Sequence, residues 1–251
     1  MLHRAIIILV VVLTSSVSFA FRAGEPAGFS QRLSKAAIER TAHKVIYDGA
    51  YRRIEYPNGD VPEHVGVCTD VLIRTYRKLG IDLQTDVHEE MKSHFDVFPK
   101  KWGLSHPDPN IDHRRVPNLQ TLFKRKGIVL PVTANPKDYV TGDLVTWVVA
   151  GTLPHIGIVV NRLSNDGKRP LIVHNIGRGP QLEDMLFEYP ITGHYRYYGR
   201  NMGPGLHSSH PAEICSIKSL CFSLVEVYTS SSNLSLLTEL SSIRSARLST
   251  V

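Results

Sequence analysis

The sequence of 251 residues has few cysteines and only one long apolar run. Its three cysteines are Cys68, Cys215 and Cys221. A chain of this length buries a full core without disulfide support. Beyond residue 20 no stretch is apolar enough to cross a bilayer, and no basic run is interleaved with aromatic residues. We therefore expect no nucleic-acid partner and no stable membrane insertion of the mature chain.

The overall composition is that of a globular protein. It is 42% hydrophobic and 21% charged, which excludes a wholly disordered chain. The net charge of +6 and the isoelectric point near 9.2 favour anionic surroundings such as a cell wall or membrane headgroups.

Residues 1–20 have the layout of a secretory signal peptide. His3 and Arg4 form a short basic start, Ala5 to Leu13 are uninterruptedly apolar, and Ser18-Phe19-Ala20 is a small-x-small cleavage pattern. The alternative, a membrane anchor, requires roughly 20 apolar residues. We expect cleavage after Ala20 and a periplasmic or secreted protein, in a compartment where thiols normally pair.

The rest of the chain predicts a linker over 21–29, one domain over 30–203 and a tail over 204–251. Expected helices cover 30–47, 68–79 and 118–126, with loops over 49–66 and 99–117. Short β-branched or aromatic runs predict strands over 144–149, 156–161, 171–175 and 195–198. Helices followed by an antiparallel sheet indicate an α+β domain.

The tail over 204–251 is rich in Ser and Leu and has no clear period. We interpret it as poorly ordered and non-native coding sequence. The alternative is a small helical hairpin closed by a Cys215–Cys221 disulfide. The main domain is expected to be a monomer.

Cys68 is the candidate nucleophile. It begins a predicted amphipathic helix, where unpaired backbone N–H groups and the helix dipole favour negative charge. Such a position is expected to depress the pKa of a thiol, and the same N–H groups suit an oxyanion. The alternative is an inert cysteine that packs the helix against the sheet.

His155 is the candidate base. It opens an apolar predicted strand, where an unpaired imidazole costs a few kcal/mol, so it needs a polar partner. A thiol at a helix N-terminus supplies one. The orienting residue is His174 or Asn175, which end the next strand. Because strand neighbours face opposite ways, only one of the two can serve.

A zinc enzyme is the main competitor, because the chain has 12 histidines. His88 and His94 superficially resemble a zinc-binding helix, but two ligands on one helix face must be four residues apart. Gly177-Arg178-Gly179 is too short for a phosphate loop. We expect no metal and no cofactor.

Three motifs resemble the papain-like NlpC/p60 family of cell-wall cysteine peptidases. They are the helix beginning at Cys68, the strand opener Gly142-Asp143-Leu144-Val145, and Pro154-His155-Ile156-Gly157-Ile158 followed by Ile172-Val173-His174. The resemblance implies an N-terminal helical layer on a central antiparallel sheet, with His174 favoured over Asn175 as the third residue.

The chain resembles more closely a YijF-like exported family grouped under a domain of unknown function. The motifs that carry this are YPNGD at 56–60, GVCTD at 66–70 and IDHRRVPNL at 111–119. One departure from NlpC/p60 is the acid, which stands at Asp70, after the nucleophile rather than before it. Substrate recognition is therefore expected to differ.

The predicted function is an exported cysteine hydrolase that cleaves an amide bond in peptidoglycan peptides through a Cys68 thioester, with His155 as general base and acid. Predicted substrate-binding residues are Asp70, Asp112, His113, Arg114 and Arg115, because Arg binds carboxylates bidentately. For residues 112–115 the alternative is an ordinary ion-paired loop, and for Asp70 it is a carboxylate that complements the helix N-terminus. The alternative functions are a non-catalytic envelope-binding module on the same scaffold and an amide transferase.

Overall fold

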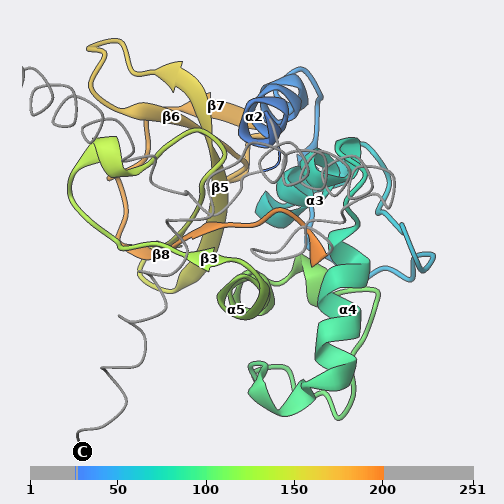
Figure 1. Ribbon diagram of the computed structural model, residues 1–251. Helices are drawn as coiled ribbons and strands as arrows, with labels where there is room; N and C mark the ends of the chain where they lie inside the picture. The colour runs from blue at the N-terminus through green and yellow to red at the C-terminus, as the bar shows by residue number, and fades with distance from the viewer. Residues whose placement is uncertain (1–25, 27, 201–251) are drawn as a thin grey trace, which may run out of the picture. The chain divides into compact units, whose positions relative to one another are not determined.

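The computed structural model describes residue 26 and residues 28–200. The predicted signal peptide, most of the linker and the tail with Cys215 and Cys221 lie outside the described residues. Within them, four α-helices and a six-stranded antiparallel sheet form an α+β fold (Figure 1). No helix among these residues has the length and apolarity that crossing a membrane requires.

The helices come first along the chain and the main sheet afterwards, as the sequence predicts. The four helices are α2 (Phe29–Arg40), α3 (Cys68–Lys78), α4 (Leu83–Ser93) and α5 (Val116–Lys126). Single 3-10 turns are η1 (Phe95–Val97), η2 (Asp112–Arg114) and η3 (Pro136–Asp138).

The main sheet has the strand order β3-β8-β4-β5-β6-β7, with antiparallel neighbours. Its strands are β3 (Ile128–Val129), β4 (Leu144–Val149), β5 (Leu153–Leu163), β6 (Pro170–His174), β7 (Gln181–Glu183) and β8 (Ile191–Arg196). A separate parallel pair joins β1 (Ile46–Tyr47) to β2 (Val65–Gly66).

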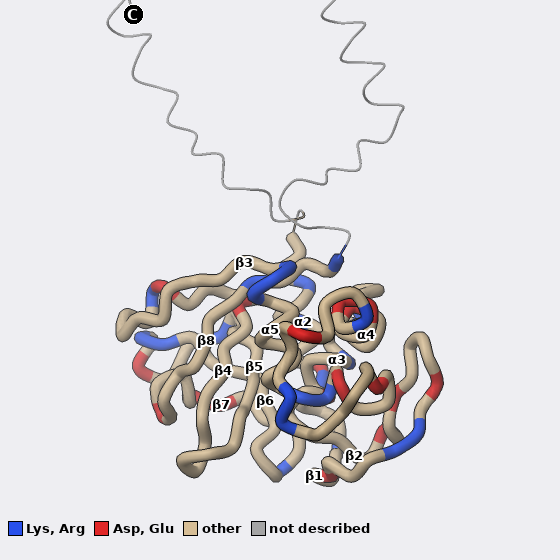
Figure 2. Tube along the Cα trace, turned by 90° about the horizontal axis from the view of Figure 1, so that it is seen from below, with Lys and Arg blue, Asp and Glu red and all other residues tan. Residues whose placement is uncertain are grey.

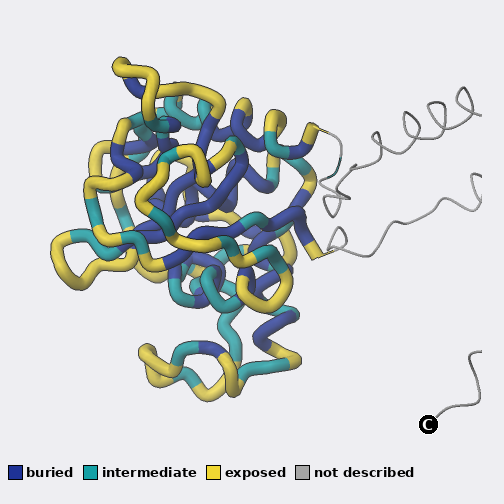
Figure 3. Tube along the Cα trace, turned by 60° about the vertical axis from the view of Figure 1, so that its left-hand side comes forward, coloured by how far each residue is buried: buried dark blue, intermediate teal, exposed yellow. Residues whose placement is uncertain are grey.

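One face of the sheet is covered by helices. Side chains of α2, α3 and α5, such as Leu33, Leu72 and Leu122, pack with Ile156 and Ile158 of β5 in one buried cluster. These alternate β5 residues point to the helical side, because side chains along a strand face opposite ways in turn. Figure 3 shows the central strands as the most buried part, with exposed loops around them.

The opposite face of the sheet carries a smaller core. Val145, Trp147, Val159 and Ile172 pack there with Tyr139 and with Met185 and Leu186 of the loop after β7. The Trp147 indole N–H donates to the carbonyl oxygen of Leu186 at 3.0 Å, which fixes this loop over the face. His155 pairs with Trp147 across β4 and β5, so it belongs to this second face.

Two expectations from the sequence, the end of the first helix and the end of the linker, are wrong. The helix predicted over 30–47 ends at Arg40, and Ile46 and Tyr47 form β1 instead, since the apolar residues near 45 pair with β2. The linker expected to reach residue 29 ends earlier, because Phe29 begins α2 and is buried. Helix α4 and the short strands β3 and β7 were not predicted.

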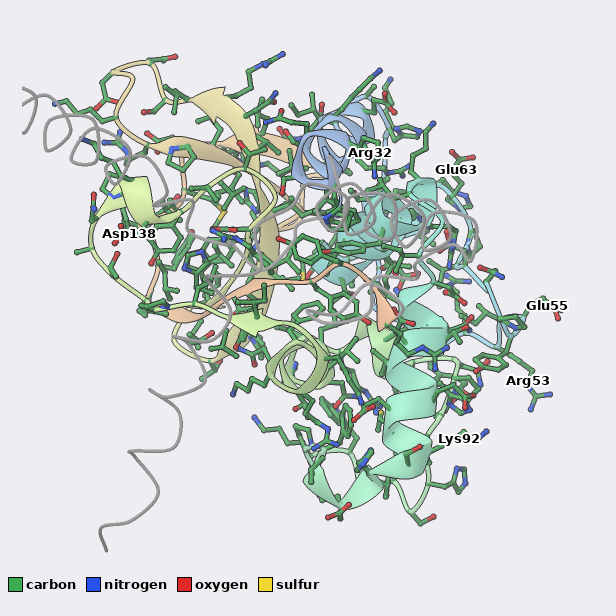
Figure 4. The ribbon with its side chains drawn as sticks, in the orientation of Figure 1. Arg32, Arg53, Glu55, Glu63, Lys92 and Asp138 are labelled. Atoms are coloured by element: carbon green, nitrogen blue, oxygen red, sulfur yellow. The ribbon has the colours of Figure 1, made fainter. Side chains whose placement is uncertain are left out.

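Charged side chains are interspersed over the fold. Lys and Arg positions and Asp and Glu positions are both scattered along the trace (Figure 2). Figure 4 shows Arg53, Glu55, Glu63 and Lys92 pointing outward at the periphery. All four are exposed. Charge alone therefore does not mark a functional surface on the described part of the chain.

Candidate active site

Helix α3 begins at Cys68, as the sequence predicts. Its first turn is held by Asp70, whose carboxylate accepts the backbone N–H of Val67 at 2.6 Å. This is the cap that a helix N-terminus needs, because its first N–H groups have no partner within the helix. The backbone N–H groups of Cys68 and Thr69 act on the sulfur and favour its thiolate.

The thiol of Cys68 lies against β5 at Ile156, the residue after His155. A hydrogen bond from the backbone N–H of Ile156 to the sulfur favours the thiolate. Ile158 pairs with Val173, so β6 ends level with Gly157, and the preceding part of β5 has no β6 partner. The start of α3 therefore reaches the strand where β6 has ended.

The pKa of the Cys68 thiol is opposite in direction to the expectation from the sequence. Burial raises it to about 11, Asp70 adds to the rise, and the surrounding backbone N–H groups offset only part of it. Desolvation penalises the charged form, and at 4% exposure Cys68 is desolvated. The thiol of the resting protein is therefore neutral at pH 7.

His155 is directed at a second histidine. Its Nε2 atom lies 3.0 Å from Nδ1 of His174, and the two rings meet edge to face. Burial, and then His174, lower the pKa of His155 to about 3. No hydrogen bond among the described residues joins the His155 ring to the sulfur of Cys68. The contact with His174 uses Nε2 of His155 and not its Nδ1.

The sheet register explains why these two histidines meet. Ile158 pairs with Val173, which sets Gly157 opposite His174 and leaves His155 diagonal to it on the same face. Diagonal neighbours are within reach of long side chains. A Cβ atom on Gly157 would lie 2.6 Å from Cγ2 of Ile172 and 3.2 Å from Cβ of His174. The bare glycine therefore leaves room for the imidazoles.

Of the two candidate orienting residues, His174 contacts His155 and Asn175 does not. The Asn175 side chain instead accepts the backbone N–H of Gly177 at 3.0 Å and lies 3.5 Å from the carbonyl oxygen of Gly66. Asn175 thus ties the end of β6 to the segment that leads into α3.

Glu183 on β7 continues the series of hydrogen bonds. Its Oε2 atom lies 2.9 Å from Nε2 of His174, and its Oε1 accepts from the Arg178 guanidinium at 3.0 Å. Burial lowers the pKa of His174, and the Glu183 carboxylate opposes this change. The sequence reasoning missed Glu183, because β7 is only three residues long and has no pattern of its own.

Tyr47 is a second residue that the sequence reasoning missed. It lies in β1, and its hydroxyl interacts with the Cys68 thiol. Burial and then the thiol raise the pKa of Tyr47 to about 12. The half-exposed Tyr47 side chain therefore adjoins an almost fully buried thiol.

Asp70 and Arg114 form a buried ion pair rather than an open clamp. The Arg114 guanidinium donates to both Asp70 oxygens at 2.9 Å, and their side chains are 2% and 3% exposed. Arg114 also donates to the carbonyl oxygens of Asp48 and Ala50 at 3.1 and 3.2 Å. The pair therefore fixes the segment after Tyr47 against the first turn of α3.

The neighbouring residues of the predicted substrate clamp are also used internally. Asp112 is buried and accepts from the backbone N–H of Asp108 and from Arg115. His113 is buried, and burial lowers its pKa to about 3. Arg115 is partly exposed and lies over the ring of Trp102, 4.1 Å from its centroid. We now interpret Asp70, Asp112, His113 and Arg114 as structural.

Two cavities of the described fold lie away from these residues. One of about 780 Å³ lies between Tyr139, Arg162 and Pro170, and one of about 430 Å³ between Asn58, Asp82 and Arg200. Neither is lined by Cys68 or His155. Cys68, His155 and His174 are buried and open into neither of these two cavities.

Fold and site together define an α+β protein with a buried His155–His174 pair on two adjacent strands and a buried thiol at a helix N-terminus against the first of these strands. Residues 34–197 match the family described as "Domain of unknown function (DUF1287)", and the chain belongs to this family. A relative from Escherichia coli (strain K12), "Uncharacterized protein YijF", is 48% identical over 166 residues, which cover 66% of this chain and 80% of the relative. The matched range lies within the predicted domain, 30–203.

Proposed function

We propose that this chain is an exported cysteine hydrolase of the papain-like NlpC/p60 kind that cleaves an amide bond in peptidoglycan peptides. The observation that carries the proposal is a thiol at a helix N-terminus that contacts β5 at Ile156, next to His155, whose ring is held 3.0 Å from His174. Nucleophilic catalysis by cysteine needs this combination of thiol, base and orienting group.

The proposed reaction begins from a neutral pair. As the Cys68 sulfur attacks the amide carbonyl carbon, its proton passes to Nδ1 of His155. The carbonyl oxygen becomes an oxyanion near the backbone N–H groups of the first turn of α3, which turn to it from the sulfur. Collapse breaks the C–N bond, the proton of His155 goes to the leaving amine, and a thioester remains.

Water completes the cycle. His155 takes a proton from water as the oxygen attacks the thioester carbon, the C–S bond breaks, and the proton returns to the sulfur. Because the pKa of Cys68 is raised to about 11 and that of His155 is lowered to about 3, both groups start in the required neutral form at pH 7.

One observation favours the alternative, a non-catalytic binding module. The thiol is 4% exposed and adjoins Tyr47, so it meets substrate only after a local movement. A module that merely binds the envelope needs no such movement and would tolerate replacement of the cysteine.

Digestion of purified sacculi distinguishes the two functions. Wild-type protein, Cys68→Ala and His155→Gln are incubated with sacculi, and soluble fragments are analysed by mass spectrometry while bound protein is measured by co-sedimentation. We expect fragments from the wild type only, and circular dichroism should show that the wild type and both variants are folded. Equal release from all three removes the hydrolase, and binding without release supports the binding module. If the wild-type protein neither binds the sacculi nor releases fragments, both functions are ruled out.

A further inference from the structure

A series of hydrogen bonds crosses three adjacent strands on one face of the sheet. It runs from His155 on β5 to His174 on β6 at 3.0 Å, and from His174 to Glu183 on β7 at 2.9 Å. The register sets His174 opposite Gln181, which makes Glu183 its diagonal neighbour, as His155 is on the other side. The series is thus a product of the strand pairing.

The carboxylate at the end of the series fixes the proton on His174. An ionised carboxylate only accepts hydrogen bonds, so Nε2 of His174 must carry the hydrogen that it donates to Glu183. In the neutral imidazole the other nitrogen, Nδ1, is then an acceptor. His174 therefore presents a lone pair, and not a hydrogen, to His155.

The tautomer of His155 follows from that of His174. Because Nδ1 of His174 accepts, Nε2 of His155 must donate, so the neutral His155 ring carries its hydrogen on Nε2. Its Nδ1 atom is then unprotonated. This is the only ring nitrogen on which His155 can receive a proton from a thiol.

We propose that Glu183 is a positioning residue, which acts through His174 to hold His155 in the tautomer with a free Nδ1. The role in catalysis rests on the proposed function, whereas the assignment of the two tautomers does not. Arg178 supports Glu183 from the outside, donating to its second oxygen at 3.0 Å. When His155 accepts a proton, the carboxylate also stabilises the resulting cation through the intervening ring.

Histidine tautomers are measured directly by long-range ¹H–¹⁵N correlation spectra of the full chain labelled with ¹⁵N-histidine at pH 7.5. His155→Gln and His174→Gln assign the two signals. We expect both rings in the wild type to carry hydrogen on Nε2. A hydrogen on Nδ1 of His155 in the wild type would overturn the proposal.

Two variants test whether Glu183 sets this state. In Glu183→Lys the ammonium group donates to Nε2 of His174, so we expect both rings to shift to the tautomer with hydrogen on Nδ1. In Glu183→Gln the uncharged amide offers both a donor and an acceptor to His174. We therefore expect a mixture of the two tautomers at each histidine. If both variants keep the wild-type tautomers, Glu183 does not set them.

Asp184 provides matched controls on the next residue. Its carboxylate pairs with Arg169, and its side chain is 33% exposed against 32% for Glu183. Asp184→Lys and Asp184→Asn make the same charge changes away from the histidines, so we expect wild-type tautomers and wild-type activity. Altered tautomers in these controls would show a general charge effect and overturn the specific role.

Activity provides the second readout. For Glu183→Gln we expect kcat to fall about 10- to 100-fold with KM unchanged, the range found when partners that orient a metal-binding histidine are removed. Unchanged kcat alongside altered tautomers would remove the catalytic role of Glu183. If the wild type cleaves no amide, the proposed function fails, and the spectra alone decide the tautomer assignment.

Discussion

The Nε2 atom of His155 lies 3.0 Å from the Nδ1 atom of His174, although 19 residues separate the two in the chain. The contact exists because β5 and β6 pair with a register that sets the histidines diagonally on one face, with Gly157 between them. The geometry of the candidate site thus follows from the pairing of two strands.

This arrangement makes Gly157 sensitive to substitution. We expect Gly157→Ala to lower the free energy of unfolding by about 1–3 kcal/mol, as overpacking a core does, because the added Cβ meets Ile172 at 2.6 Å. Urea denaturation measures the change. In the matched control Gly49→Ala, the nearest atom is 3.5 Å away, and we expect a change of at most about 0.5 kcal/mol. Equal effects of the two would contradict the packing argument.

The buried ion pair at the start of α3 yields a second prediction. Asp70→Asn leaves Arg114 buried without its counter-charge, so we expect a loss of about 3–5 kcal/mol in unfolding free energy. Asp184→Asn removes an exposed Asp–Arg pair and is expected to cost at most about 1 kcal/mol. A stable Asp70→Asn protein with weakened substrate binding would instead restore the substrate-clamp interpretation.

The raised pKa of Cys68 predicts how its alkylation depends on pH. With a thiol pKa of about 11, the rate of labelling by iodoacetamide should increase about tenfold per pH unit between pH 7 and 10. Mass spectrometry of the peptide that contains Cys68 separates it from the other two cysteines. A rate that is already constant below pH 6 would show a preformed thiolate–imidazolium pair instead.

Tyr47→Ala serves as the matched variant in the same experiment. Removing the side chain that adjoins the sulfur should raise the labelling rate at every pH. Tyr47→Phe, which keeps the ring and loses the hydroxyl, should have the smaller effect. If neither variant changes the rate, another segment covers the thiol.

Buried histidines make the fold sensitive to acid. Burial lowers the pKa of His113 to about 3, against about 6.5 in an unfolded chain, so the unfolded state binds a proton first as the pH falls. The contribution of His113 to stability is therefore complete above pH 6.5 and is lost toward pH 3.

Unfolding free energies at pH 7 and pH 5 test whether His113 makes the fold less stable as the pH falls. We expect the loss between the two pH values to be about 1–2 kcal/mol smaller in His113→Gln than in the wild type. His106→Gln, at an exposed position, should lose as much as the wild type. A larger loss in His113→Gln than in the wild type would contradict the account.

The sequence predicts those parts of the fold that have a strong local pattern. The helix from Cys68 has clear hydrophobic periodicity, the strand over 144–149 is a β-branched and aromatic run, and the structure has both nearly to the residue. The helix expected through residue 47 fails because Ile46 and Tyr47 are used by a distant strand, β2. Pairing over such a distance overrides local propensity.

In the candidate site too, residues in local motifs could be predicted, whereas residues placed by long-range strand pairing could not. Cys68 and His155 stand in recognisable local motifs, and the structure brings the thiol beside the strand segment that carries His155. Glu183 and Tyr47 come from strands of three and two residues, whose partners are set only by the folded sheet. The pKa of the thiol was expected in the wrong direction because burial outweighs the helix N-terminus, and burial is not visible in a sequence.

The most direct test of the central claim is to trap the thioester. Wild-type protein is mixed with soluble peptidoglycan peptides, quenched in acid, digested and analysed by mass spectrometry for an acyl group on the peptide that contains Cys68. The account predicts the adduct in the wild type, its absence in Cys68→Ala, and a much slower appearance in His155→Gln. Cleavage of the peptides without any adduct, at an equal rate in Cys68→Ala, would contradict it.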